Sequence, residues 1–434
     1  MKKRWKSKTK WIMVGILFFV ICLALVGFCF RIFQKSSEDL QSITKITFTL
    51  ENCPAGDTIE PKRLTVMAIG TTEDGKNISQ RLSADRYMIE PEQVPEHGHD
   101  FELRVTLKEN PKIQISEKVR IKREELKRYE IGRSNPKKVQ AILYKNGDLE
   151  IVGTGEVKKF QETALPWKND TVSYLTWIDP RAVIESMDFW FSGQETFEGM
   201  TCSVPDSVKS MVRTFYGCMA MTSVPDMTTA VNLEDLTACY SNSAVTGGGQ
   251  FPGNLKSAEE TFKNCSELLH AADASACVRL KNMKNCYSGC INLSDTSTPD
   301  CVENLEGTYQ NCLNIKNANI PSKVKNMDLS FAGCTSLEKV KGEIPTSCTN
   351  VSGTFRDCKF LSGTIDIHCS VTDISQMFAG AARNGKGLTV AISWEGEESK
   401  QTSQEILQNI QEEMERQIQQ DGSSITVRIL EKNE

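Results

Sequence analysis

The sequence predicts a chain of mixed α/β and β class, with one membrane-spanning helix, one small β domain and one long repeat solenoid. Three observations support this prediction. Twenty residues near the N-terminus have no charged side chain, the next region alternates apolar and polar residues, and a third region repeats one apolar ladder every 22 to 25 residues. Each period is typical of a different structure, so the chain divides into three structurally different parts.

Residues 1–10 form a basic tail with six Lys or Arg residues and no acid. The uncharged stretch from Trp11 to Phe30 follows, and twenty helical residues are about 30 Å long, enough to cross a bilayer's hydrocarbon core. Residues 11–33 are therefore predicted to be a transmembrane signal anchor. Because basic residues concentrate on the cytoplasmic side, we expect a single-pass protein of the cell membrane with a cytoplasmic N-terminus and an extracellular C-terminal bulk.

A cleaved signal peptide is the alternative interpretation of the same residues. Its apolar region is normally shorter and ends at a small-x-small cleavage site. Residues 25–30 read LVGFCF, and Phe28 stands where a lipoprotein would need a small residue before Cys29. These features favour an uncleaved anchor, and later removal of the anchor stays open.

A polar linker, residues 34–42, leads into the region of period two. Residues 43–128 are predicted to form a small, immunoglobulin-like β-sandwich, which we expect to act as a stalk. Cys53 is the single cysteine of this region, so the disulfide of true immunoglobulin domains is missing. Alternation marks the strands at Ile46-Phe48-Leu50, Leu64-Val66-Ala68, Phe101-Leu103-Val105-Leu107, Ile113-Ile115 and Val119-Ile121.

A β-hairpin is predicted next, because two alternating runs flank Asn146-Gly147, a strong hairpin turn signal. Residues 133–200 are assigned to this hairpin and the N-terminal cap of the solenoid. The array itself is assigned to residues 201–382. One copy places apolar residues at Val208, Met211, Phe215 and Cys218, and a period in the low twenties indicates a solenoid.

The aromatic position of the ladder recurs at residues 215, 262, 287, 309, 331, 355 and 378. A degenerate copy assigns Ala238 to the aromatic position and Ser241 to the cysteine position, with Gly247-Gly248-Gly249 inserted after it. Spacings of i, i+3, i+7 and i+10 predict one face of a short helix. The β-prone run that follows, residues 221–225 in the first copy, predicts one strand per repeat. Each repeat is thus predicted to be a leucine-rich-repeat-like coil.

The copies read approximately V-x-x-M-x-x-(M/T)F-x-x-C-x-x-L and resemble the BspA-like bacterial surface proteins with leucine-rich-type repeats. The resemblance covers about residues 196–382, and residues 147–155 with Pro166-Trp167 look like the segment that often leads into such arrays. It implies a cell-surface location and, in some members, attachment to host matrix proteins or other cells. The ligand stays unidentified, because the motif residues are the buried ones.

Residues 383–434 are predicted to be a β-α-β cap that closes the open end of the solenoid. A strand is expected over residues 387–392, and a last strand follows over residues 425–430. The helix between them, residues 403–420, has one apolar stripe that includes Ile410 and Met414. A partner-binding or coiled-coil helix is the alternative for this segment.

Sixteen cysteines allow three interpretations: buried thiols, disulfides or a metal site. We expect mainly buried thiols, which behave as small hydrophobes. One or two disulfides are the alternative outside a cell, although side chains in one column point in parallel. Cys286 and Cys290 have the best zinc-like spacing but lack a second pair. One repeat position holds Cys218, Cys265, Cys290, Cys312, Cys334 and Cys358.

Catalysis is not expected, and no catalytic, cofactor-binding or metal-binding residue is assigned. The chain has four histidines. His97 and His99 with Asp100 have metal-ligand chemistry but are expected to lie in a solvated loop, and His270 and His368 are expected to be structural. The glycine runs lack the Lys and Ser/Thr of a phosphate-binding loop, so no small-molecule substrate is evident.

Two function classes follow. From residue 36 onward acidic residues outnumber basic ones by 13, which argues against nucleic acid as a partner. The favoured hypothesis is a membrane-anchored bacterial surface protein whose solenoid binds a protein ligand, either host matrix or the cell's own envelope. The alternative is a structural or accessory subunit of a cell-envelope assembly.

Overall fold

The computed structural model describes residues 43–71, 77–368, 374–384, 386–393, 408–409, 411–416, 419–420 and 424–429. The predicted tail, transmembrane anchor and linker, residues 1–10, 11–33 and 34–42, lie outside these residues. Within the described part of the chain, no helix is both long and apolar enough to cross a membrane. The chain divides into two compact units, Met1–Arg123 and Glu124–Glu434.

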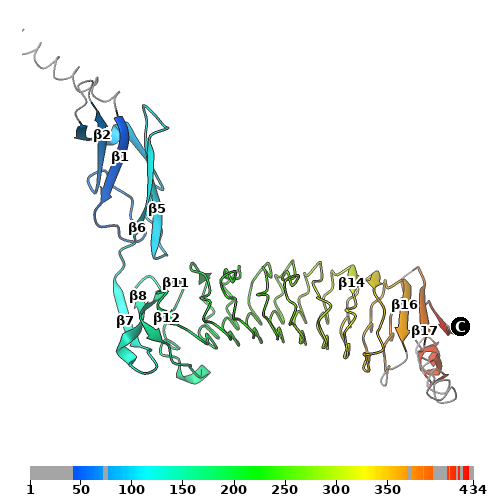
Figure 1. Cartoon of the computed structure of the whole chain (residues 1–434). Helices are drawn as coiled ribbons and strands as arrows, with labels where there is room; N and C mark the ends of the chain where they lie inside the picture. Colours follow the sequence, from blue (N-terminus) through cyan, green and yellow to red (C-terminus); the bar gives the residue numbers. More distant parts are fainter. Residues whose placement is uncertain are drawn as a thin grey trace, which may run out of the picture. The chain divides into compact units, whose positions relative to one another are not determined.

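The first unit contains two antiparallel sheets of three strands that share one core (Figure 1). Alternation of residues explains this core, because every second side chain of a strand faces the same side. In β5, for example, Phe101, Leu103, Val105 and Leu107 are buried while the residues between them face outward. One sheet has β1 (Ile43–Leu50), β2 (Leu64–Thr71) and β3 (Asn77–Arg81); the other has β4 (Tyr87–Glu90), β5 (Asp100–Leu107) and β6 (Gln114–Arg120), with the 3-10 helix η2 (Ala84–Arg86) before β4.

The second unit begins with an antiparallel hairpin that turns at Asn146-Gly147, where Gly147 has a φ of 84°. The strand pairing then changes from antiparallel to parallel, because β9 pairs in parallel with β11 and β11 in parallel with β13. This change starts the solenoid. The sheet order is β13-β11-β9-β8-β7, from β7 (Glu125–Glu130), β8 (Val139–Tyr144), β9 (Asp148–Gly153), β11 (Tyr174–Ile178) and β13 (Gly199–Met200). Beside it lie β10 (Gly155–Glu156), β12 (Ala182–Val183), η3 (Pro136–Lys138) and η4 (Glu162–Ala164).

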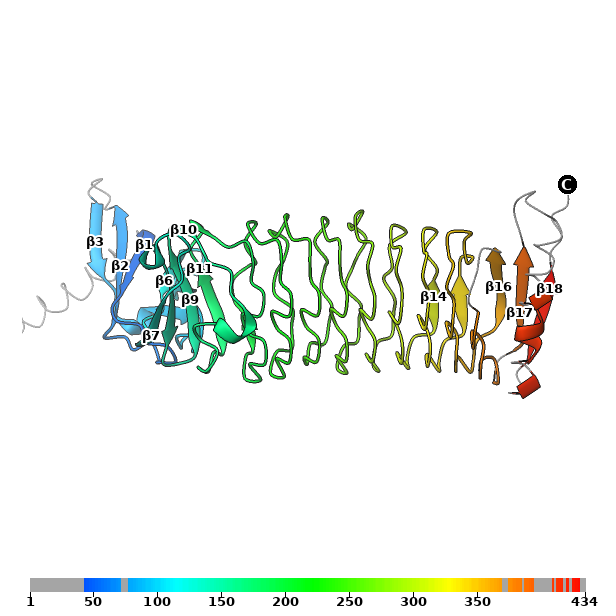
Figure 2. The same ribbon diagram turned by 90° about the horizontal axis from the view of Figure 1, so that it is seen from below.

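Coils then stack in register along the solenoid (Figure 2). A continuous series of parallel bridges joins equivalent residues of successive coils: Ser186, Ser210, Asp235, Ser257, Asn282, Asn304, Asn326 and Asn350. After β13 the next strands of the array are β14 (Asn317–Asn319), β15 (Lys339–Lys341) and β16 (Gly363–His368), and the coils between are joined by isolated bridges. The side chains of the apolar ladder form one core along the whole array.

The predicted α/β class is wrong, because the protein is mostly β and its described repeats contain no helix. The ladder segments are successive tight turns instead. In each coil the residues two before and two after the aromatic have a positive φ, for example Arg213 at 51° and Gly217 at 71° around Phe215. A left-handed residue interrupts the hydrogen bonding of an α-helix, so two of them in five residues exclude one.

Because the ladder segments are not helical, their backbone N–H groups can donate hydrogen bonds to the neighbouring coil. Around Phe215, alternate residues donate to the next coil: Met211 N to Asp235 O, Arg213 N to Thr237 O, Phe215 N to Cys239 O and Gly217 N to Ser241 O, at 2.8 to 3.0 Å. The residues between them close turns within their own coil, as Thr214 N does to Met211 O at 3.3 Å. The solenoid is therefore held by a backbone ladder even where no strand is present.

The chain's C-terminal sheet continues this stacking. β17 (Leu388–Ser393) pairs in parallel with β16 on one side and with β18 (Ile425–Ile429) on the other. Described helical residues lie between β17 and β18 in the sequence, at 408–409, 411–416 and 419–420. Met414 from this segment is buried against the core of the solenoid.

Candidate binding surface of the solenoid

The aromatic residues of the ladder form a stacked column through the core. Neighbouring rings lie 5.1 to 5.9 Å apart and are within 19° of parallel. Offset stacking of this kind adds to the free energy gained by burial. The column contains Phe191, Phe215, Tyr240, Phe262, Tyr287, Tyr309, Phe331, Phe355 and Phe378.

The degenerate copy keeps this column, which corrects two assignments. Tyr240, not Ala238, stacks between Phe215 and Phe262. Ser243, not Ser241, takes the cysteine position, because its Oγ lies 3.6 Å from the Sγ of Cys265. The aromatic steps thus become 25 and 22 residues on either side of Tyr240.

The polar ladder residues are buried and bonded to the coil before them. Thr308 Oγ1 donates to Met283 O at 2.7 Å and Ser330 Oγ to Leu305 O at 2.9 Å. A buried hydroxyl without such a partner would cost about 1–3 kcal/mol. The column of ladder cysteines bonds in the same way, with Cys334 Sγ donating to Tyr309 O at 3.0 Å.

All thirteen described cysteines are free thiols. Burial raises their pKa where a shift is resolved, to about 11 for Cys265 and about 12 for Cys334. A thiol with so high a pKa stays protonated at neutral pH and is a poor nucleophile or metal ligand. The ladder cysteines therefore act as packing and hydrogen-bonding groups.

The four histidines do not converge. His99 contacts the guanidinium of Arg120, while His270 Nδ1 lies 2.9 Å from Asp295 Oδ2 in the next coil. His368 lies 2.9 Å from Ser393 Oγ and 3.0 Å from Glu343 Oε2. No group of three or more His, Cys, Asp or Glu residues that could hold a metal was found among the residues described.

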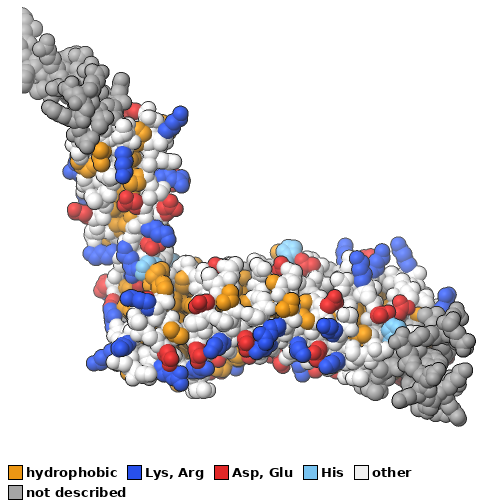
Figure 3. Space-filling model, viewed as in Figure 1, with side chains coloured by type: hydrophobic (Ala, Val, Ile, Leu, Met, Phe, Trp, Pro, Cys, Tyr) orange, Lys and Arg blue, Asp and Glu red, His pale blue; other side chains and the backbone are white. Residues whose placement is uncertain are grey.

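Acidic and basic residues share one exposed column of the array, two residues before the Met211-type position of successive coils. Glu303 accepts from Lys281 at 2.8 Å and from Lys325 at 2.7 Å, one coil away on each side. These two ammonium groups lower the pKa of Glu303 to about 2. Similar pairs join Lys209 to Glu185 and Lys256 to Glu234. Figure 3 shows acidic and basic side chains together on one face of the solenoid.

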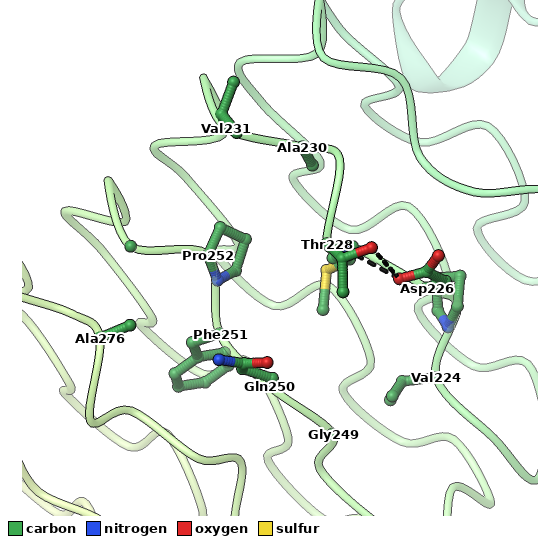
Figure 4. A pocket seen from close by; sticks show the side chains of 13 residues that line it. Val224, Asp226, Thr228, Ala230, Val231, Gly249, Gln250, Phe251, Pro252 and Ala276 are labelled. Carbon is green, nitrogen blue, oxygen red and sulfur yellow. Dashed lines mark hydrogen bonds between the residues drawn. The ribbon is translucent and has the colours of Figure 1, made fainter.

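A hollow of about 500 Å³ opens between two coils in the degenerate part of the array (Figure 4). Its lining includes the apolar side chains of Met227, Phe251 and Pro252. We call it the short-loop hollow. It is lined by Val224, Pro225, Asp226, Met227, Thr228, Ala230, Val231, Gly249, Gln250, Phe251, Pro252, Gly253 and Ala276.

Loop length explains the hollow. The ladder residue Leu233 comes seven residues after Asp226, and Leu280 comes seven residues after Asp273. Leu255, by contrast, comes only five residues after Gln250. The middle loop contacts both neighbours, since Asn254 Nδ2 donates to Val231 O on one side and Phe251 N to Asp273 O on the other. The middle loop is therefore recessed between two longer neighbours.

The inserted glycines allow the coils to approach at this point. A Cβ on Gly248 would lie 2.3 Å from the backbone nitrogen of Ala272. A Cβ on Gly249, which has a φ of 64°, would lie 2.6 Å from Val224 Cγ2. Other residues at these two positions would push the neighbouring coils apart.

Stacked parallel coils with one continuous buried ladder define a repeat solenoid, a class in which each unit packs only against its neighbours. Residues 258–381 match the family model described as BspA type leucine rich repeat region, in six copies. The chain therefore carries BspA-type leucine-rich repeats, which confirms the resemblance seen in its sequence. The short-loop hollow lies almost entirely before the matched residues.

A search of solved structures found similarity to a leucine-rich repeat protein from Eubacterium ventriosum. The two chains are 14% identical, with a TM-score of 0.37, and the match covers 62% of this chain and 78% of that chain. The comparison with curated proteins gave no match.

Proposed function

We propose that this protein is a non-catalytic scaffold that binds another protein through the exposed residues of its solenoid, at the surface of a bacterial cell. The observation that carries the proposal is the separation of roles within each coil. Ladder residues such as Phe262 and Thr308 are fully buried and bonded internally. The positions between them are exposed and differ from coil to coil, which provides a long, varied surface for a macromolecular partner.

Membrane attachment is part of this proposal and rests on the sequence of residues 1–33. The six basic residues of the tail precede an uncharged stretch long enough to span a bilayer. The solenoid would then be outside the cell. The β domain of residues 43–123 would follow the anchor in the sequence and precede the solenoid. Protease treatment of intact cells tests this: we expect digestion of the solenoid and retention of a short N-terminal fragment in the membrane fraction. Protection of the solenoid until the cells are lysed would contradict it.

Binding can be tested with the full chain, solubilised in mild detergent and coupled to beads. The beads are offered purified host matrix proteins in one arm and detergent extract of the cell's own envelope in the other. Capture of a matrix protein supports adhesion to a host. Stoichiometric capture of an envelope protein supports the alternative role, a subunit of a cell-envelope assembly. Capture of neither contradicts both roles.

A further inference from the structure

The short-loop hollow has a charge arrangement that the charged column of the solenoid lacks. Asp226, Gln250 and Asp273 occupy equivalent positions of three successive coils, with Gln250 bridged to Asp273. Within the described part of the chain, neither aspartate forms an ion pair with Lys or Arg. Elsewhere on the array, by contrast, Glu234 and Glu303 are paired with lysines of neighbouring coils.

Hydrogen bonds favour the ionised form of both aspartates. Asp226 accepts from Thr228 N at 2.9 Å, Thr228 Oγ1 at 2.7 Å and Ser203 Oγ at 2.8 Å, and these bonds lower its pKa. The backbone and hydroxyl of Ser275 lower the pKa of Asp273 in the same manner. Asp226 therefore places one fixed negative charge in the lining of the hollow, and Asp273 places a second in the next coil, where it is bridged to the lining residue Gln250. No cationic residue lines the hollow.

Exposed valines stand on the two longer loops. Val231 and Val278 stand two residues before the ladder leucines of the two longer loops and are 55% and 76% exposed. Gly253 takes the same position in the short loop between them. Val231 and Asp226 line the hollow together with Phe251 and Pro252 of the short loop (Figure 4), and Val278 belongs to the loop of the next coil.

We propose that the short-loop hollow receives a large apolar side chain of a partner protein that has a lysine or arginine next to it in an extended segment. This inference rests on the proposed protein-binding function and assigns a site and a chemistry to it. The volume of the hollow lies within the range of about 300–1,000 Å³ that is typical of ligand pockets. Burial of the apolar group supplies affinity, and the cation finds the carboxylates that the protein leaves without a counter-ion.

The test is a selection from a phage library of random linear peptides against the full chain. The binding of the selected peptides to the wild type is then compared with their binding to two variants. In Ala276→Trp the indole fills the hollow, and in the double variant Asp226→Asn/Asp273→Asn both carboxylates are replaced. Asparagine keeps an oxygen that accepts the turn hydrogen bonds, as it does at Asn282, so the double variant removes charge alone. Asp366→Asn on β16, several coils away, is the matched control, and unchanged melting temperatures verify folding.

The expected result is a set of peptides with an aromatic or large aliphatic residue beside Lys or Arg. Their binding should fall at least tenfold in Ala276→Trp and at least threefold in the double variant, and stay unchanged in Asp366→Asn. Peptides that bind Ala276→Trp and wild type equally would overturn the hollow as the site while leaving a binding solenoid intact. Acidic or purely polar peptides lost in Ala276→Trp would overturn the assigned chemistry. Recovery of no peptide would contradict the hollow and leave the bead experiment to decide the wider function.

Discussion

The ring of Tyr240 lies 5.1 Å from the ring of Phe262, with 10° between their planes. Because of this contact, the aromatic column continues without a gap in the copy whose sequence departs most from the repeat pattern. Tyr240 is also fully buried, and its ring lies 5.4 Å from Phe215 on the other side. The degenerate copy is thus a full structural coil.

Replacing Tyr240 with alanine should therefore destabilise the solenoid by about 3–5 kcal/mol, since it removes a buried ring and leaves a cavity. Tyr216→Ala is the control, because Tyr216 belongs to the same turn of the preceding coil but is only partly buried. Urea unfolding followed by circular dichroism measures both. Equal midpoints for the two variants would show that the column is interrupted at this coil.

Thr308 tests the buried hydroxyl bonds between coils. Thr308→Val keeps the shape but removes the donor to Met283 O and Leu305 O, so we expect a loss of about 1–3 kcal/mol. Thr308→Ser should recover most of it, because Ser330 makes the same two bonds one coil later. A serine variant as unstable as the valine variant would assign the effect to packing of the methyl group.

Alanine substitutions at two glycines can distinguish the cost of backbone strain from the cost of a steric clash. Gly193 and Gly289 have φ values of 76° and 78°, but a Cβ on Gly193 meets nothing within 4 Å while one on Gly289 lies 2.5 Å from Asn264 Oδ1. Gly193→Ala should cost about 1–2 kcal/mol for the left-handed backbone alone. Gly289→Ala should cost more, because Asn264 must also give up its bond to Asn242. Thermal unfolding of the two variants measures the difference.

Glu303 gives the charged column a pH dependence. Its pKa is about 2 in the folded protein and about 4.5 when unfolded, so its stabilising contribution is present above pH 4.5 and is lost as the pH falls toward 2. The melting temperatures of wild type and Glu303→Gln should therefore differ most near neutral pH and converge in acid. High salt should reduce the difference at every pH, because all three charged groups lie at the surface. A difference that grows in acid would contradict the assignment.

The sequence predicted the repeat and its buried residues, because burial imposes the same side chains at each turn of the solenoid. It predicted a helix wrongly for a physical reason. Successive tight turns place residues such as Met211, Phe215 and Cys218 inward with nearly the same spacing as a helical face. Residues at positive φ distinguish the two, and only some of them are Gly or Asn; Arg213 and Glu260 give no such signal.

The short-loop hollow was only partly predictable. The glycine insertion and the two-residue difference in loop length are visible in the sequence. The register that makes the middle loop recede depends on Tyr240, not Ala238, being the aromatic of that coil. The Asn ladder from Asn282 to Asn350 was also missed, although Asn recurs there one residue before each ladder Met, Leu or Val.

The backbone bonds that run from each coil to the next also determine how this protein would respond to tension. A force that peels the chain from the C-terminal end would break the bonds of the outermost coil first, since that coil has a neighbouring coil on one side alone. The array would then lengthen in steps, one coil at a time. Each step would release 22 to 25 residues, or roughly 80 Å of chain. At a cell surface under shear, such a solenoid would absorb mechanical work by partial unravelling while its remaining coils stayed folded.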